Sequence, residues 1–231
     1  MHDAIVVTLA VGRRYADMAA AFMGYLSHVG NAVLAVTDTP GAFSGTGVEL
    51  LPYVPETAHV WHGKRHAVRA GLERARTVYF MDADHVLAPG AEAPRLAALP
   101  PGPHSRIWRL PLAHIDFHKL GMADASIWIG FAAEVLGIEN WRQKLWWWGD
   151  SMWALAGGEL DRCTRFCAAW DAFAAFVGET PPPHPFMLGD GVALSFAAHL
   201  GGWGSDIHRT NFDALEGAFE HAEIGGWRMM P

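Results

Sequence analysis

The sequence has few cysteines and no long apolar run, and each absence excludes a class of protein. Cys163 and Cys167 are the only 2 cysteines among 231 residues, which is too few for a disulfide framework. Their spacing suits two reduced thiols packed on one face of a helix. No run of about 18 apolar residues could span a bilayer, and the first residues lack the basic region and apolar stretch of a signal peptide. We therefore expect a cytoplasmic protein without a transmembrane segment.

Positive charge is also scarce. Lys and Arg together number 17 against 24 Asp and Glu, a net charge of −7, and the basic residues form no long run. Nucleic acid is therefore not an expected partner. No GxGxxG or GxxxxGK[ST] pattern occurs, which argues against a dinucleotide-binding Rossmann site or a P-loop.

The sequence contains enough hydrophobic residues to form a sizeable core. Hydrophobic residues make up 51% of the chain and charged residues 18%, with 11 tryptophans, as in a folded globular protein. The length of 231 residues suits one sizeable domain, which we take to be residues 1–231.

Strand-like and helix-like segments alternate along the chain. Apolar runs at residues 4–10, 32–36, 48–51, 77–81, 106–110 and 152–156 predict strands. Helical spacing of apolar residues predicts helices over residues 18–29, 67–75 and 159–176, and another that begins near Asp190. Residues 122–131 fit neither period. The alternation predicts an α/β fold with a Rossmann-like, mostly parallel central sheet flanked by helices.

Two carboxylates end the strand at residues 77–81. Asp82 and Asp84 follow this buried run directly, at the carboxyl end of the strand, which is the side where open α/β sheets bind ligands. Residues at i and i+2 of an extended segment project the same way, so both carboxylates can share one hard cation. That cation could hold a diphosphate, while a polar turn without function is the alternative.

Basic and aromatic residues supply further candidates. Lys64, Arg65 and Arg69 lie on or near the helix before this strand, where they could reach phosphates or a sugar; a solvated basic face is the equal alternative. Three consecutive tryptophans at 146–148 cannot all point into one core from a regular helix or strand. At least one is expected to line a cleft or a subunit contact.

Four blocks of sequence, in this order, resemble one enzyme family. They are residues 34–40 (LAVTDTP), 78–84 (VYFMDAD), 149–158 (GDSMWALAGG) and 189–195 (GDGVALS). The chain resembles nucleotide-sugar glycosyltransferases of the GT-A fold. It is most similar to glycosyltransferase family 6, which includes the histo-blood-group ABO transferases.

The resemblance implies a reaction and a division of the domain. A hexose would pass from a UDP-sugar to a saccharide or glycoconjugate acceptor, with retention at the anomeric carbon. Residues 1–90 would form the nucleotide-binding half and residues 105–231 the acceptor and catalytic half. Mn²⁺ or Mg²⁺ would be held by Asp82 and Asp84. Independently of the resemblance, His208 could be a third metal ligand or a phosphate contact.

The resemblance and the strand ends together define the expected site residues. The donor-binding set is Thr8, Ala10, Asp38, Lys64, Arg65, Arg69, Asp82, Ala83 and Asp84. The acceptor-binding set, which could stack on sugar rings, is Trp146, Trp147, Trp148 and Trp153, with core packing as the alternative for each one. Asp150 and Asp190 are the candidate catalytic carboxylates, with a turn or a helix cap as their alternative.

One position departs from the family. The residue that matches the family's glutamate beneath the anomeric carbon is Gly191. Two alternatives therefore stay open: an inverting transferase of the same fold with Asp150 or Asp190 as general base, and an inactive protein that binds a sugar or nucleotide. The sequence also leaves open the donor sugar, the acceptor and the oligomeric state, a homo-oligomer included.

Overall fold

The structure, a computed structural model, describes residues 1–54, 60–105, 110–114, 124–147, 152–157, 160–183, 190–204, 208–209, 212, 215 and 217–221. No helix within these residues is long and apolar enough to cross a bilayer.

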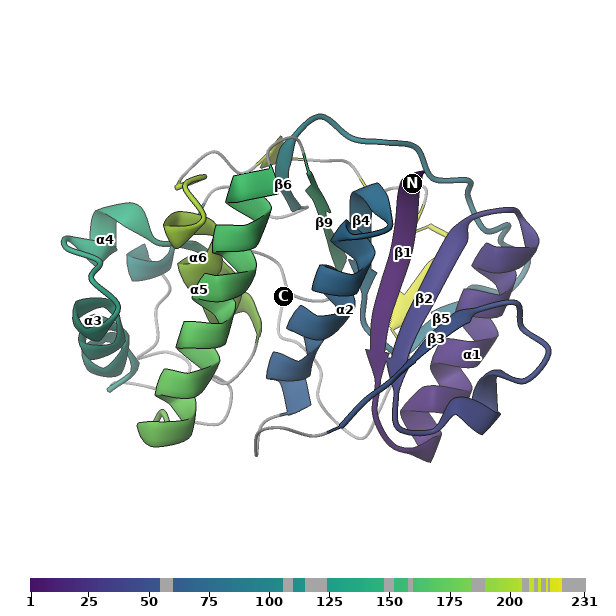
Figure 1. The fold of residues 1–231 in the computed structure, drawn as a ribbon, viewed down its shortest axis with the longest axis horizontal. Helices are drawn as coiled ribbons and strands as arrows, with labels where there is room; N and C mark the ends of the chain where they lie inside the picture. Colours follow the sequence, from purple (N-terminus) through teal and green to yellow (C-terminus); the bar gives the residue numbers. More distant parts are fainter. Residues whose placement is uncertain are drawn as a thin grey trace.

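A seven-stranded sheet organises the molecule. Its strands are β1 (His2–Ala10), β2 (Ala32–Thr37), β3 (Glu49–Pro52), β4 (Ala75–Met81), β6 (Gly102–Ser105), β9 (Met152–Ala156) and β10 (His208–Arg209). Their spatial order is β10-β6-β9-β4-β1-β2-β3 (Figure 1). Strands β1 to β4 pair in parallel, whereas β9 is antiparallel to both of its neighbours, β4 and β6. The predicted α/β fold with a mostly parallel sheet is therefore confirmed.

Helices cover both faces of this sheet (Figure 1). The helices of the described residues are α1 (Arg13–His28), α2 (Lys64–Leu72), α3 (Ala125–Val135), α4 (Trp141–Lys144), α5 (Leu160–Glu179) and α6 (Asp190–Leu200), with short 3₁₀ turns at Pro40–Phe43, Val60–Gly63 and Leu112–His114. Of these, α3 and α4 lie beyond α5, at the left of Figure 1. Successive residues of a strand point to opposite faces. Ile5 and Val7 accordingly belong to the core cluster on the side of α2, α5 and α6, while Val6 belongs to the cluster on the side of α1.

Two small sheets and an irregular segment after β5 complete the described fold. Strand β5 (His85–Leu87) pairs with β11 (Phe219–His221), and β7 (Leu110–Pro111) pairs with β8 (Trp146–Trp147), both antiparallel. The segment after β5, residues 88–101, has no regular structure, but side chains near the sheet hold its backbone. Asn31 Oδ1 accepts from the Leu96 N–H (2.8 Å), and the Tyr79 hydroxyl donates to the Ala97 carbonyl (2.8 Å).

Two segments differ from the sequence-based expectation. Next to the strand expected at residues 106–110, the structure has β6 at Gly102–Ser105 and β7 beginning at Leu110, while residues 106–109 lie outside the described part of the chain. The unassigned stretch near residue 125 is helix α3. The helical spacing of its apolar residues is not recognisable in the sequence, because Ile127, Phe131 and Val135 are apolar yet exposed, at 72%, 48% and 55%.

Candidate functional site

Three parallel strands end together at the edge where β1 finishes. Ala10, the last residue of β1, pairs with Thr37, the last residue of β2. On the other side, the Thr8 hydroxyl donates to the carbonyl of Met81, the last residue of β4 (2.7 Å). Asp38 and Asp82 follow β2 and β4, so they lie about two strand spacings apart, or about 10 Å between backbones. The described polar side chains at this edge form the candidate site.

The turn that carries Asp82, Ala83 and Asp84 is fixed at both ends. It leaves β4 in the middle of the large sheet and enters β5, which β11 pairs. His85 Nδ1 lies 2.8 Å from the Asp82 carbonyl, and since a carbonyl only accepts, Nδ1 carries the proton. The His85 ring is 2% exposed and packs edge-on against Phe22 at 6.1 Å. The two carboxylates therefore project from a turn with a defined conformation.

Lys64 joins this turn from the first residue of α2. Its Nζ lies 2.5 Å from Asp82 Oδ1 and 5.1 Å from the centre of the Phe80 ring. The Lys64 residue is buried, at 6% exposure. A carboxylate and an aromatic face both stabilise an ammonium group, so Lys64 is a fixed positive charge beside the acidic pair.

Asp38 forms a second polar point at the edge. Its Oδ1 accepts from the Gly12 N–H (2.8 Å) and from the Thr39 hydroxyl (2.9 Å), while the residue itself is exposed. Gly12 has φ 83°, a backbone conformation that side chains disfavour, so glycine is needed to present this N–H. An exposed carboxylate held in one orientation can accept hydrogen bonds from ligand hydroxyls.

The donor chemistry of the acidic pair fits a hard divalent cation. Mg²⁺ and Mn²⁺ prefer carboxylate oxygens, and Asp82 and Asp84 supply two such groups from one turn. The ammonium group of Lys64 disfavours the binding of a cation at Asp82 Oδ1, because it already contacts that oxygen. Among the described side chains, no group of three or more His, Cys, Asp or Glu converges on one point.

The backbone of His208 lies well away from this pair. In backbone register His208 lies opposite His104, which lies opposite Ala154, which lies opposite Tyr79 of β4. Three strand spacings of about 4.8 Å separate the β10 and β4 backbones by roughly 14 Å, before the three further residues to Asp82 are counted. This separation concerns the backbone alone, since the side chain of His208 is not described, and the assignment of His208 as a third metal ligand stays a prediction.

Four of the expected donor-binding residues have other roles. Thr8 and Ala10 are fully buried, and the Thr8 hydroxyl is used inside the sheet on Met81. Arg65 and Arg69 reach across to α5, where Arg65 Nε lies 2.6 Å from Asp171 Oδ1 and Arg69 Nη2 lies 2.6 Å from Asp171 Oδ2. These contacts tie the fold together, and Asp38, Lys64, Asp82, Ala83 and Asp84 stay candidates for donor binding.

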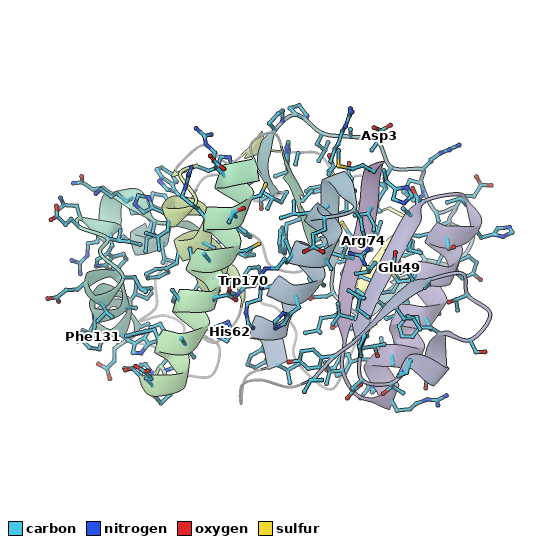
Figure 2. All side chains as sticks on the ribbon, in the orientation of Figure 1. Asp3, Glu49, His62, Arg74, Phe131 and Trp170 are labelled. Atoms are coloured by element: carbon cyan, nitrogen blue, oxygen red, sulfur yellow. The ribbon has the colours of Figure 1, made fainter. Side chains whose placement is uncertain are left out.

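The expected acceptor tryptophans divide in the same manner. Trp153 is 0% exposed, stacks on Phe80 at 5.3 Å and contacts Trp170 at 6.2 Å, so it is a core residue and not a sugar platform. Figure 2 labels Trp170 on α5 and His62 near the start of α2, in the region where these helices approach each other. Trp146 and Trp147 are half-buried on β8 and stay candidates.

Two of the other candidates lie outside the described part of the chain. Trp148 and Asp150 belong to residues 148–151, which the structure does not describe. Asp190 is the first residue of α6, as expected, although its side chain is likewise not described. Gly191 is buried, and its carbonyl accepts from the Ser195 hydroxyl at 2.8 Å.

Two residues that hold the candidate site in place were not predicted from the sequence. His85 follows the acidic pair directly, and a histidine at that place could have been recognised as a partner for the turn. Asp171 lies four residues after the buried Cys167 on α5, and a carboxylate beside a buried helix face could have been considered as a partner for Arg65 and Arg69.

No protein-family model matches the chain, and no curated protein matches it at a significant level. The chemistry of the site therefore follows from the residues described above.

Proposed function

We propose that the protein is a metal-dependent glycosyltransferase of the GT-A fold that moves a hexose from a UDP-sugar to a saccharide or glycoconjugate acceptor, with retention. The observation that carries this proposal is the pair of carboxylates, Asp82 and Asp84, on a fixed turn at the carboxyl edge of a mostly parallel sheet. That edge is where open α/β sheets bind nucleotides. The proposed retention rests on the family resemblance.

Each remaining donor-site residue has a role in this proposal. Asp82 and Asp84 hold Mn²⁺ or Mg²⁺, which when bound supplies Lewis acidity at the diphosphate leaving group. Lys64 adds a positive charge on the same side of the turn. Asp38, about 10 Å away across β1, accepts hydrogen bonds from the ribose hydroxyls.

The catalytic and acceptor residues come from the second half of the chain. Asp190 begins α6 and stabilises the positive charge that develops at the anomeric carbon, with Asp150 as the other carboxylate of the pair. The matching family glutamate is Gly191 here, so these aspartates must supply the negative charge. Trp146 and Trp147 offer half-buried ring surface to the acceptor sugar.

A transfer assay tests this function. UDP release from a panel of UDP-hexoses, offered with mono- and disaccharide acceptors, should require Mn²⁺ or Mg²⁺ and stop on chelation. Asp82→Asn and Asp84→Asn should each lower the rate at least about a hundredfold, whereas Asp17→Asn, an exposed acid on α1, should leave it unchanged. Full activity in both site variants would exclude the proposed metal chemistry, and an inverted product anomer would exclude retention.

A further inference from the structure

We infer that Lys64 and a divalent cation are alternative partners of the Asp82 carboxylate, so that the cation binds weakly alone and strongly together with the donor diphosphate. The inference rests on the proposed function, because it concerns the same cation and the same diphosphate. It adds a mechanism by which this chain couples the binding of the two.

The contacts of Lys64 restrict its ammonium group to the acidic turn. Lys64 Nζ is 2.5 Å from Asp82 Oδ1, its side chain is 8% exposed, and the Phe80 ring lies beneath it at 5.1 Å. The backbone of Lys64 begins α2, whose next residue, Arg65, is anchored on Asp171. A buried lysine held by its helix and by an aromatic face stays at the carboxylate unless a competing charge displaces it.

A cation at Asp82 competes directly with this arrangement. Divalent cations bind carboxylate oxygens at about 2.1 Å, so a cation on Asp82 Oδ1 would lie within about 4.6 Å of Nζ, the sum of 2.1 Å and the 2.5 Å ion-pair distance. Two positive charges that close repel strongly in a partly buried site. Lys64 must therefore leave Asp82 before a cation can bind that oxygen well.

A diphosphate relieves the conflict. It carries negative charge to both positive groups, and the flexible four-carbon stem of lysine allows its ammonium group to turn from the carboxylate to a phosphate oxygen. Cation and diphosphate then each favour the binding of the other, which is a positive coupling between two ligands. Without Lys64 the cation would meet no ammonium group at Asp82 Oδ1 and would depend less on the diphosphate.

The test compares Mn²⁺ binding with and without UDP in three proteins, by calorimetry. Lys64→Met should bind Mn²⁺ alone at least about tenfold more tightly than wild type, because a like charge has been removed from the site. Lys144→Met makes the same change of charge on the exposed lysine of α4 and should bind Mn²⁺ as wild type does. The enhancement of Mn²⁺ affinity by UDP should be large in wild type and in Lys144→Met and small in Lys64→Met.

Two further variants control for the possibility that Lys64→Met misfolds. Lys64→Gln keeps a hydrogen-bond donor for Asp82 and should repeat the Lys64→Met result, while Lys64→Arg keeps the charge and should bind Mn²⁺ alone as weakly as wild type. If wild type binds UDP with Mn²⁺ but neutral variants bind Mn²⁺ alone no better, the inference is overturned and the proposed function stands. If wild type binds no UDP at any Mn²⁺ concentration, the proposed function is overturned together with the inference.

Discussion

Replacing Asp171 by alanine should destabilise the fold, because this one carboxylate holds α2 against α5 through two arginines. Its oxygens accept from Arg65 Nε and from Arg69 Nη2, each at 2.6 Å. In Asp171→Ala both guanidinium groups lose their carboxylate. Arg65 keeps its hydrogen bond from Nη1 to the His62 carbonyl at 2.7 Å.

The exposure of the three side chains sets the magnitude of this effect. Removing one partner of a buried ion pair costs about 3–5 kcal/mol, and removing one partner of an exposed pair costs about 0–1 kcal/mol. The Arg65 side chain is only 9% exposed, but Asp171 is 43% exposed and Arg69 is 40% exposed. An intermediate loss of about 2 kcal/mol follows, which is a fall in Tm of roughly 4–8 °C for a domain of this size.

Urea and thermal unfolding of Asp171→Ala and wild type measure the loss. Asp17→Ala is the control, since Asp17 forms an ion pair with Arg13 on the surface of α1 and should give no resolvable change in Tm. A double-mutant cycle should show stronger coupling of Asp171 to Arg65 than to the half-exposed Arg69. If Asp171→Ala proves no less stable than Asp17→Ala, the ion pairs of Asp171 with Arg65 and Arg69 do not hold α2 and α5 together.

Further predictions concern alkaline stability and the core. Burial raises the pKa of Tyr79 from 10.0 to about 12, so its contribution to stability is complete below pH 10 and is lost as the pH rises from 10 to 12. At pH 11 the loss should be on the order of 1 kcal/mol, and Tyr79→Phe should lose correspondingly less stability than wild type between pH 9 and 11; parallel curves would contradict this. Trp153→Ala should cost about 4 kcal/mol because Trp153 is fully buried against Phe80, whereas Trp146→Ala should cost clearly less; equal losses would place both rings in the core.

The first half of the fold and the acidic turn follow from local sequence signals. Apolar runs of strand length alternate with helical spacing up to Met81, and parallel strands place their carboxyl ends on one edge. Asp38 and Asp82 could therefore be assigned to that edge before the structure was known. The same logic placed Thr8 and Ala10 at this edge, where the structure has them, but strand-end position does not reveal that both residues are fully buried.

The partners of neighbouring residues are not encoded in local patterns. Lys64 and Arg65 are adjacent basic residues, but a helix turns about 100° per residue, so one reaches Asp82 and the other Asp171. The pattern of β9 predicts a strand yet carries no information on its direction or on its place between β4 and β6. Strand β11 pairs with β5 although more than half of the chain separates them in sequence. Only three residues of each strand take part, and so short a strand has no recognisable sequence pattern.

Calorimetric titration of UDP tests the central claim most directly, namely that Asp82 and Asp84 bind a diphosphate through a divalent cation. Wild type should bind UDP with Mn²⁺ and show no binding after chelation, and Asp84→Asn should lose the Mn²⁺-dependent binding. UDP at about a hundred times its Kd should also add roughly 2.7 kcal/mol to the stability of wild type. UDP affinity that is the same with Mn²⁺ and with chelator, or the same in wild type and Asp84→Asn, would contradict the account.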